Sequence, residues 1–212
     1  MGMPVETATQ RGQQTRERLL RAATELIPVL GWSGVTTRKV AERAGLRPGL
    51  VHYHFPSVDD LLTEAALAFT RSALTGPLHL LDDAPDLASG IVALVEALDA
   101  YTGQDEASLL MVEAYLAATR DARLREGMAA ALAEFRAAVR ERLAGQVPDA
   151  DSAAALLGAV LDGLILHRSL APMPTTAATA AHLLRMIGLP TAAAEDPASP
   201  DEEPSSMREG ES

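Results

Sequence analysis

Apolar side chains recur every three or four positions along most of the chain, and stretches in which they alternate with polar ones are hard to find. The first helical stretch begins at Thr15 and carries its apolar stripe on Leu19, Ala23, Leu26 and Leu30. Gly31 follows at the position where helices commonly end, because glycine adopts the left-handed conformation without strain. The pattern predicts a first helix that ends before Gly31, preceded by a flexible arm over residues 1–14.

A short second helix is expected over residues 38–44. Thr36 or Thr37 can cap its first turn, because a threonine hydroxyl accepts a hydrogen bond from a free backbone N–H group. Gly45 ends this helix, and a third helix is expected to follow almost at once.

Pro48 suits the first turn of that third helix, because its ring presets φ and its missing N–H would have no partner there. Val51 and Phe55 lie one turn apart and are expected to point inward. Pro56 ends the helix, so the two short helices and the turn between them occupy about twenty residues.

Further amphipathic helices, separated by Pro, Gly and Asp signals, are expected at residues 57–74, 87–101, 105–118, 122–144, 151–170 and 175–187. The last two carry wide, nearly uncharged apolar stripes on Leu156, Leu157, Val160, Leu161, Leu164, Leu183, Leu184 and Ile187. Such stripes pack helix on helix, within the fold or between subunits, and these eight side chains are the predicted dimer interface. Residues 190–212 are rich in Ala, Pro, Ser, Asp and Glu, which predicts a disordered acidic tail.

The composition favours an all-α fold. Hydrophobic residues make up 48% of the 212 residues and aromatic residues only 3%, with Ala and Leu in excess. The absence of cysteine excludes disulfides, thiolate catalysis and Cys-ligated metals, and no apolar leader follows Met1. The best apolar run, residues 153–166, is interrupted by Asp162 and Gly163 and falls short of the roughly 18 residues of a membrane span. A globular, cytoplasmic protein with no membrane partner is expected.

Charge is distributed unevenly along the chain. The net charge of −11 would argue against a polyanionic partner, but residues 1–55 carry a net +4 and the remaining residues carry −15. This asymmetry indicates a basic, nucleic-acid-facing unit attached to an acidic body. The basic unit includes a cluster of Arg11, Arg16, Arg18 and Arg21, which is either a solvated helical face or a set of phosphate contacts.

Residues 35–55 combine a short helix, a tight turn with glycine and a second short helix with many polar side chains. This is the helix-turn-helix arrangement, whose second helix enters the DNA major groove. With Thr36, Thr37, Ala41, Ala44, Gly45, Gly49, Tyr53, His54, Phe55 and Leu61, the chain resembles the TetR family of transcriptional regulators over about residues 15–62. The resemblance implies a three-helix DNA-binding domain at residues 15–56 and a helical effector-binding and dimerisation domain at residues 57–189.

The expected DNA-binding residues are Thr36, Thr37, Arg38, Arg47, Pro48, Gly49, Leu50, His52 and Tyr53. Arg47 occupies the expected N-cap, where a cation opposes the helix dipole, so its guanidinium either reaches a phosphate or a guanine edge or is solvated. Tyr53 resembles the family's phosphate-contacting tyrosine. His52 can read a base edge, because its ring offers a donor and an acceptor.

Two positions depart from the family pattern. Val58 stands where a lysine is common, which leaves one phosphate contact fewer at the start of the fourth helix. Leu50 stands where a small polar residue is usual, and contact with a thymine methyl group is one use for it.

The resemblance also implies that a small effector binds in the helical body and changes the spacing of two recognition helices in a homodimer. The candidate ligand-binding residues are Tyr101, Met111, Glu113, Tyr115 and Phe135, although such residues at helical spacing also form ordinary cores. The acidic body and the scarcity of aromatic residues favour an apolar or cationic effector over an anionic one.

No catalytic constellation or cofactor motif stands out in the sequence. His52 and His54 cannot chelate one ion, because alternate helical residues diverge by about 200°. Neither a phosphate-binding loop nor a G-x-G-x-x-G or G-x-S-x-G motif occurs. The prediction is a non-enzymatic, cofactor-free, ligand-responsive repressor that binds palindromic operator DNA. An all-α carrier or enzyme without DNA binding is the alternative, and no sequence feature separates repression from activation.

Overall fold

The computed structural model describes residues 8–191, and every regular element in that range is helical, which confirms the all-α prediction. The elements are α1 (Ala8–Leu30), the 3-10 turn η1 (Trp32–Gly34), α2 (Thr37–Ala44), α3 (Pro48–His54), α4 (Val58–Thr75), η2 (Gly76–Leu78), α5 (His79–Asp83), α6 (Leu87–Ala97), η3 (Leu98–Ala100), α7 (Glu106–Ala118), α8 (Ala122–Leu143), α9 (Ala150–Arg168) and α10 (Thr176–Ile187). We refer to α1–α3 as the head and to α4–α10 as the body.

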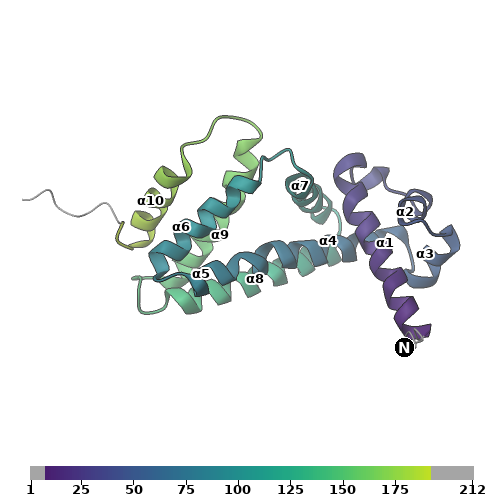
Figure 1. Cartoon of the computed structure of the whole chain (residues 1–212), viewed down its shortest axis with the longest axis horizontal. Helices are drawn as coiled ribbons and strands as arrows, with labels where there is room; N and C mark the ends of the chain where they lie inside the picture. Colours follow the sequence, from purple (N-terminus) through teal and green to yellow (C-terminus); the bar gives the residue numbers. More distant parts are fainter. Residues whose placement is uncertain (1–7, 192–212) are drawn as a thin grey trace, which may run out of the picture.

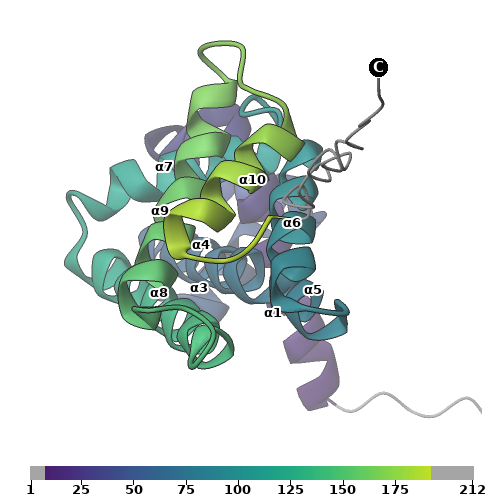
Figure 2. The same ribbon diagram turned by 90° about the vertical axis from the view of Figure 1, so that its left-hand side faces the viewer.

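The head lies at one end of an elongated molecule, and α4 runs from it into the body alongside α8 (Figure 1). At the opposite end of the body, α10 packs on α6 and α9 packs on α8 (Figure 2). Both α4 and α7 contact α1. These two body helices therefore connect the head to the rest of the protein.

Side-chain caps explain where most of the helices begin. In each of seven cases the residue before the helix accepts a hydrogen bond from a backbone N–H in the first turn, and these residues are Thr36, Ser57, Asp86, Asp105, Asp121, Asp149 and Thr175. Each such cap contributes about 0.5–2 kcal/mol to helix stability. The helices that they cap start within one residue of the positions expected from the sequence.

Two segments differ from the expectation. Helix α1 begins at Ala8, so residues 8–14 of the expected arm are helical. Their side chains are largely polar and form no apolar stripe, which is why periodicity did not reveal them. Helix α5 was not expected, because a helix of five residues is too short to show a helical period. Residues 1–7 and all but the first two residues of the predicted tail lie outside the described range.

The apolar core of the head extends beyond the head itself. Val51 and Phe55 pack with other head residues, but the same cluster includes Leu61 of α4 and Leu110 of α7. A second cluster joins α4, α7 and α8, and a third joins α5, α6, α8, α9 and α10. Because body residues complete the core of the head, a shift of α4 or α7 would change the packing of that core.

Five of the eight side chains predicted to form the dimer interface lie in the body's own core. Leu157, Leu164, Leu183, Leu184 and Ile187 are each 8% exposed or less. The interface prediction is corrected for these five, because a side chain already buried in its own subunit has little surface left for a partner. The other three, Leu156, Val160 and Leu161, keep part of their surface.

Helix α9 is long and apolar enough to cross a membrane by length and composition alone, although Asp162 and Gly163 had led us to expect otherwise. The packed helix of a soluble protein meets the same criterion, and α9 packs on α8 and contributes to the body core. Only 28% of its apolar window is buried within the subunit. Among the less buried residues of α9, Leu156 and Leu166 are exposed apolar side chains.

Candidate nucleic-acid interface and ligand cavity

Helices α2 and α3 meet at a tight turn that the local sequence sets. Thr36 caps α2 by accepting a hydrogen bond from the Lys39 N–H (3.4 Å). Gly45 ends α2 with φ of 65°, the left-handed region that favours glycine. Nη2 of Arg18 donates to the carbonyl of Ala44 (2.6 Å), which satisfies one of the free carbonyl groups at the end of α2. These contacts hold α3 at a defined angle to α2.

Helix α3 divides its side chains between core and surface as the spacing predicted. Val51 is fully buried and Phe55, just after the helix, is 2% exposed. Tyr53, on the opposite side, is 80% exposed, and His52 is exposed as well. Leu50 is 36% exposed.

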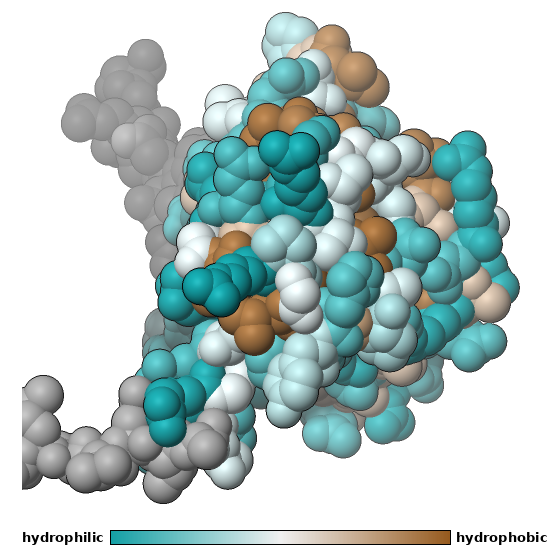
Figure 3. All heavy atoms as spheres, turned by 90° about the vertical axis from the view of Figure 1, so that its right-hand side faces the viewer, coloured by the Kyte–Doolittle hydropathy of each residue, from teal (hydrophilic) through white to brown (hydrophobic). Residues whose placement is uncertain are grey.

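The start of α3 is open to solvent. Arg47 occupies the N-cap position, is exposed and makes no side-chain capping hydrogen bond. Pro48 stands in the first turn, as predicted. A Cβ atom at Gly49 would meet nothing within 4 Å, so the fold itself does not require glycine there. Seen from the head end, the surface mixes hydrophilic and hydrophobic residues (Figure 3).

The expected contact residues on α2 also face outward. Thr36 and Arg38 are exposed, and Thr37 is partly buried. Within the arginine cluster, Arg18 binds the end of α2, and Arg16 forms an ion pair with Glu64 and lies over the ring of Phe55. These two arginines therefore have structural partners inside the protein.

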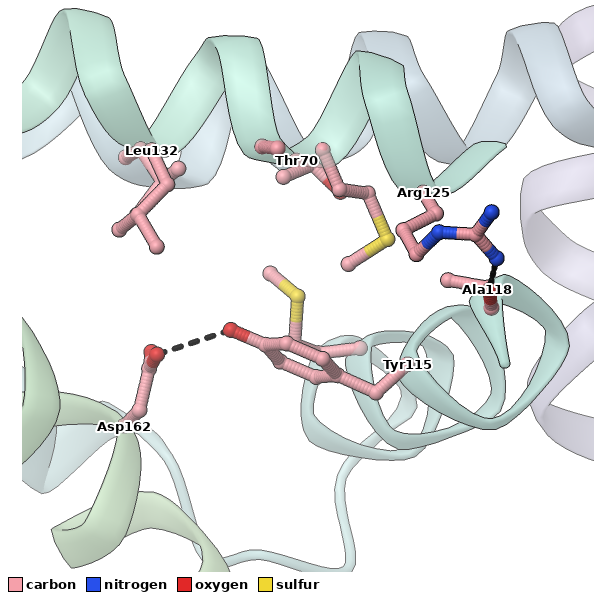
Figure 4. Close-up of a pocket in the computed structure, with 10 residues that line it drawn as sticks. Thr70, Tyr115, Ala118, Arg125, Leu132 and Asp162 are labelled. Carbon is pink, nitrogen blue, oxygen red and sulfur yellow. Dashed lines mark hydrogen bonds between the residues drawn. The ribbon is translucent and has the colours of Figure 1, made fainter. Parts of the chain in front are cut away.

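The body contains a cavity between α4, α7, α8 and α9 with a volume of about 210 Å³ (Figure 4). Its wall is formed by Thr70, Leu74, Met111, Tyr115, Ala118, Arg125, Met128, Ala129, Leu132 and Asp162. A second cavity of about 190 Å³ shares Leu74, Met111 and Asp162 with the first. We call them the first and the second cavity, and because they share part of their walls they adjoin each other.

Asp162 and Tyr115 form the main polar pair of the first cavity. The Tyr115 hydroxyl donates a hydrogen bond to the Asp162 carboxylate at 2.9 Å (Figure 4). Burial raises the pKa of Asp162, although the hydrogen bond from Tyr115 and the positive charge of Arg136 act in the opposite direction. Burial, together with the neighbouring Asp162 charge, also raises the pKa of Tyr115. Tyr115 therefore remains a donor at neutral pH.

Thr70 adds a second polar group to the same wall. Its side chain is 2% exposed, and its hydroxyl has no hydrogen-bond partner within the described part of the chain. Buried hydroxyl groups are usually paired, because leaving one unpaired costs about 1–3 kcal/mol. Thr70 contributes to the wall of the first cavity, but its hydroxyl oxygen is almost inaccessible from it.

Four of the five predicted ligand-binding residues line these cavities. Met111 and Tyr115 line the first cavity, and Tyr101, Met111 and Phe135 line the second. Glu113 lines neither, because it lies on another side of α7, where its carboxylate accepts a hydrogen bond from the Trp32 backbone N–H (2.9 Å). Its prediction as a ligand anchor is therefore corrected.

Sequence reasoning missed Thr70 and Asp162. Asp162 did carry a signal, since it is a lone carboxylate in the middle of the most apolar helix of the chain. It was interpreted only as an interruption of a membrane span. Thr70 carried no signal, because a threonine in an amphipathic helix is ordinary.

These features define an all-α, helix-turn-helix DNA-binding protein with a ligand cavity in its body. The profile described as "Bacterial regulatory proteins, tetR family" matches residues 19–65, and the profile described as "Tetracyclin repressor-like, C-terminal domain" matches residues 82–189. The chain therefore belongs to the TetR family and is a ligand-responsive, DNA-binding transcriptional regulator.

Similar proteins agree with this assignment. An uncharacterized HTH-type transcriptional regulator of Mycobacterium tuberculosis is 27% identical over 177 residues, which cover 79% of this chain and 89% of that protein. The crystal structure of a putative regulator from Streptomyces coelicolor superposes with a TM-score of 0.71 at 29% identity and covers 82% of this chain and 99% of that one. A putative regulator from Saccharomonospora viridis, crystallised in complex with choline, gives a TM-score of 0.68 at 25% identity, with coverages of 82% and 96%.

Proposed function

We propose that the protein represses transcription by binding a palindromic operator as a homodimer, and that a small molecule in the body cavities releases it from DNA. Repression, dimerisation and release by a ligand are typical of the family. In this proposal the protein acts in the cytoplasm by binding alone, without catalysis. The Saccharomonospora viridis regulator was crystallised in complex with choline, which supports small-molecule binding by a protein of this fold.

The outward face of α3 is the observation that carries the DNA-binding part of the proposal. Arg47 and His52 are exposed, and their side chains make no hydrogen bond or ion pair within residues 8–191. Tyr53 makes only an edge-on ring contact with His54, at 5.0 Å between the ring centroids. These side chains are free to contact phosphates and base edges, while Val51 and Phe55 hold the helix in place.

The exposed face of α9 supports the homodimer. Leu156 is 40% exposed and Leu166 is 42% exposed, and helical spacing places them on the same side as Val160. Ala159 and Gly163 on that side are small enough to let a second helix approach closely. Met186 of α10, which is 62% exposed, borders the same surface hollow as Leu156. We infer that two copies of this face meet and bury the apolar surface that the subunit leaves open.

Helix α7 supports a route from the cavity to the head. Met111 and Tyr115 line the first cavity, and Leu110 packs in the core of the head. Glu113 accepts a hydrogen bond from the N–H of Trp32 in η1, just after α1. A ligand that moved α7 would therefore act on both the core and the hydrogen bonding of the head. In a dimer, a small rotation of each head changes the spacing of the two α3 helices, which have to match half-sites about 34 Å apart.

A gel shift tests the DNA-binding part of the proposal, with operator fragments that the wild-type protein selects from genomic DNA. Arg47→Ala should weaken binding about fivefold to 150-fold, since an arginine contact to a base edge contributes about 1–3 kcal/mol. Tyr53→Phe should also weaken it, because a hydrogen bond from the tyrosine hydroxyl to a charged phosphate contributes about 1.5–3 kcal/mol. Neither change should alter helix content or the dimer, because both side chains are exposed.

Arg120→Ala is the matched control, since it removes an exposed positive charge in the body, far along the chain from α3. Unchanged affinity of both α3 variants would contradict the proposal. A salt titration separates the proposal from the alternative of a carrier, because each neutralised phosphate contributes a slope of about −0.9 to log K against log salt and a carrier shows no such dependence.

A further inference from the structure

The first and second cavities share a carboxylate that forms no ion pair within the described residues. Asp162 is the one acidic side chain among the described residues that line them. None of the ion pairs within residues 8–191 includes Asp162. Its hydrogen-bond partner is the Tyr115 hydroxyl, which is neutral. A partly buried carboxylate without a counter-charge is costly to maintain, and a bound cation would offset that cost.

The basic side chains nearby do not fill this role. Arg125 lines the first cavity but is exposed, and its Nη1 donates to the carbonyl of Ala118 (3.2 Å), away from Asp162 (Figure 4). Arg136 is exposed and forms no ion pair with Asp162 within the described residues. Neither arginine therefore pairs with Asp162 in the cavity wall.

The remaining wall suits the hydrocarbon part of a ligand. Met111, Met128 and Leu132 face the first cavity, and methionine side chains adapt to ligands of different shape. The Tyr115 ring beside Asp162 can also face a cation, since an aromatic face attracts positive charge.

We propose that the two adjoining cavities bind a lipophilic amine in its protonated form, with the ammonium group paired to the Asp162 carboxylate and the hydrocarbon part along Met111, Met128 and Leu132. This inference deepens the proposed function and rests on it in one respect, namely that the amine is the molecule to which the regulator responds. The two cavities adjoin at Asp162, so an elongated amine can occupy either or both of them.

Calorimetric titration of the full chain, without DNA, tests the inference with octylamine, octan-1-ol and octanoate. The three probes share one hydrocarbon chain and differ in the charge of the head group. Octylamine should bind most tightly and octanoate least tightly. Asp162→Asn should weaken octylamine binding by about tenfold to a hundredfold, because a hydrogen bond between charged groups is lost, and should leave octan-1-ol binding nearly unchanged.

Asp83→Asn is the matched control. It removes the same charge from an exposed position on α5 that makes no hydrogen bond or ion pair within the described residues, so octylamine affinity should stay at the wild-type value. If Asp162→Asn does not fold, the comparison of the three probes on the wild-type protein decides the question alone.

Three results would each overturn the inference: no binding of octylamine, octanoate binding at least as tight as octylamine binding, or equal octylamine affinity in wild type and Asp162→Asn. Because the titration contains no DNA, these results leave the gel-shift test of α3 unaffected. A protein that binds its operator but prefers octanoate would keep the proposed function and lose this inference.

Discussion

The head and the body place their candidate contact residues in opposite ways. In the head, those residues lie between Thr36 and Tyr53, close together in the sequence and largely on the outer surface. In the body, Tyr115 and Asp162 are 47 positions apart, yet they are hydrogen-bonded at 2.9 Å within a cavity wall. A surface site on two short helices needs only local spacing to form. A cavity site exists only once four helices have packed around it.

The two regions are nevertheless joined in one structure. Leu110 and Leu61 of the body complete the core of the head, and Glu113 accepts a hydrogen bond from Trp32. The division into a head that reads DNA and a body that senses a ligand is therefore one of chemistry rather than of packing. Such a joint is what a regulator needs, because a rigidly separate head could not respond to the body.

The largest expected effect is the difference in stability between changes at two neighbouring aromatic residues of the head, Phe55 and Tyr53. Phe55→Ala removes a side chain that is 2% exposed and lies under the guanidinium of Arg16, and it should lower the free energy of unfolding by about 3–5 kcal/mol. Tyr53→Ala removes a ring that is 80% exposed and should change that free energy by about 0.5 kcal/mol or less while weakening DNA binding. Urea unfolding measures both. Equal losses of stability would break the division of α3 into an inner and an outer face.

A smaller effect is expected at the joint between the regions. Glu113→Ala leaves the Trp32 N–H without its acceptor in a partly buried position and should cost about 1 kcal/mol of stability. Glu113→Gln is the control, because its amide oxygen can still accept that hydrogen bond. Thermal unfolding measures the stability, and the fraction of operator released by a saturating ligand measures the coupling. If Glu113→Ala releases operator as fully as Glu113→Gln does, the α7 route to the head is wrong.

An effect that depends on pH is expected at the start of α7. Burial opposes ionisation of Asp105, but hydrogen bonds from Ser108 and Thr102 outweigh it and lower the pKa of this carboxyl from 3.8 to about 2. The resulting stabilisation is present in full above the unfolded-state pKa and is lost as the pH falls through the folded-state value, a window from about 4 down to about 2. Asp105→Asn keeps a capping side chain but not the charge, so the variant should be less stable than the wild type at pH 7.

Unfolding of wild type and Asp105→Asn along an acid titration measures this contribution. Their stabilities should converge as the pH falls through that window, because the wild type loses the charge that the variant never had. Parallel stability curves over the whole window would show that ionisation of Asp105 does not contribute to stability. The acid sensitivity of the body would then come from other groups.

Much of the head could be predicted, because its signals are local. Thr36, Gly45 and Pro48 set the ends of α2 and α3 by capping and backbone preference, and the inward pair Val51 and Phe55 follows from one helical turn. The arginine cluster was less predictable. Arg16 and Arg18 lie on the polar side of α1, but only the packed structure shows that they bind Glu64 and the carbonyl of Ala44.

In the body, by contrast, the sequence predicted the helices but not all the residues of the candidate site. The body's helices start where capping residues predict, yet the apolar stripes did not reveal which side chains face the core. Leu157 and Leu156 are neighbours in one stripe, and the first is fully buried while the second is 40% exposed. Glu113 looked like a ligand anchor and is instead a partner of Trp32, whereas Asp162 looked like an interruption and lines the cavity.

The sequence by itself determined the fold class, the positions of the helices and the outer face of the helix-turn-helix, because capping, turn chemistry and helical period act over a few residues. Only the tertiary structure decided which apolar residues are core, which polar residues line the cavities and which element connects the two regions. Burial and pairing depend on which helices meet, and that is set by the packing of residues far apart in the chain.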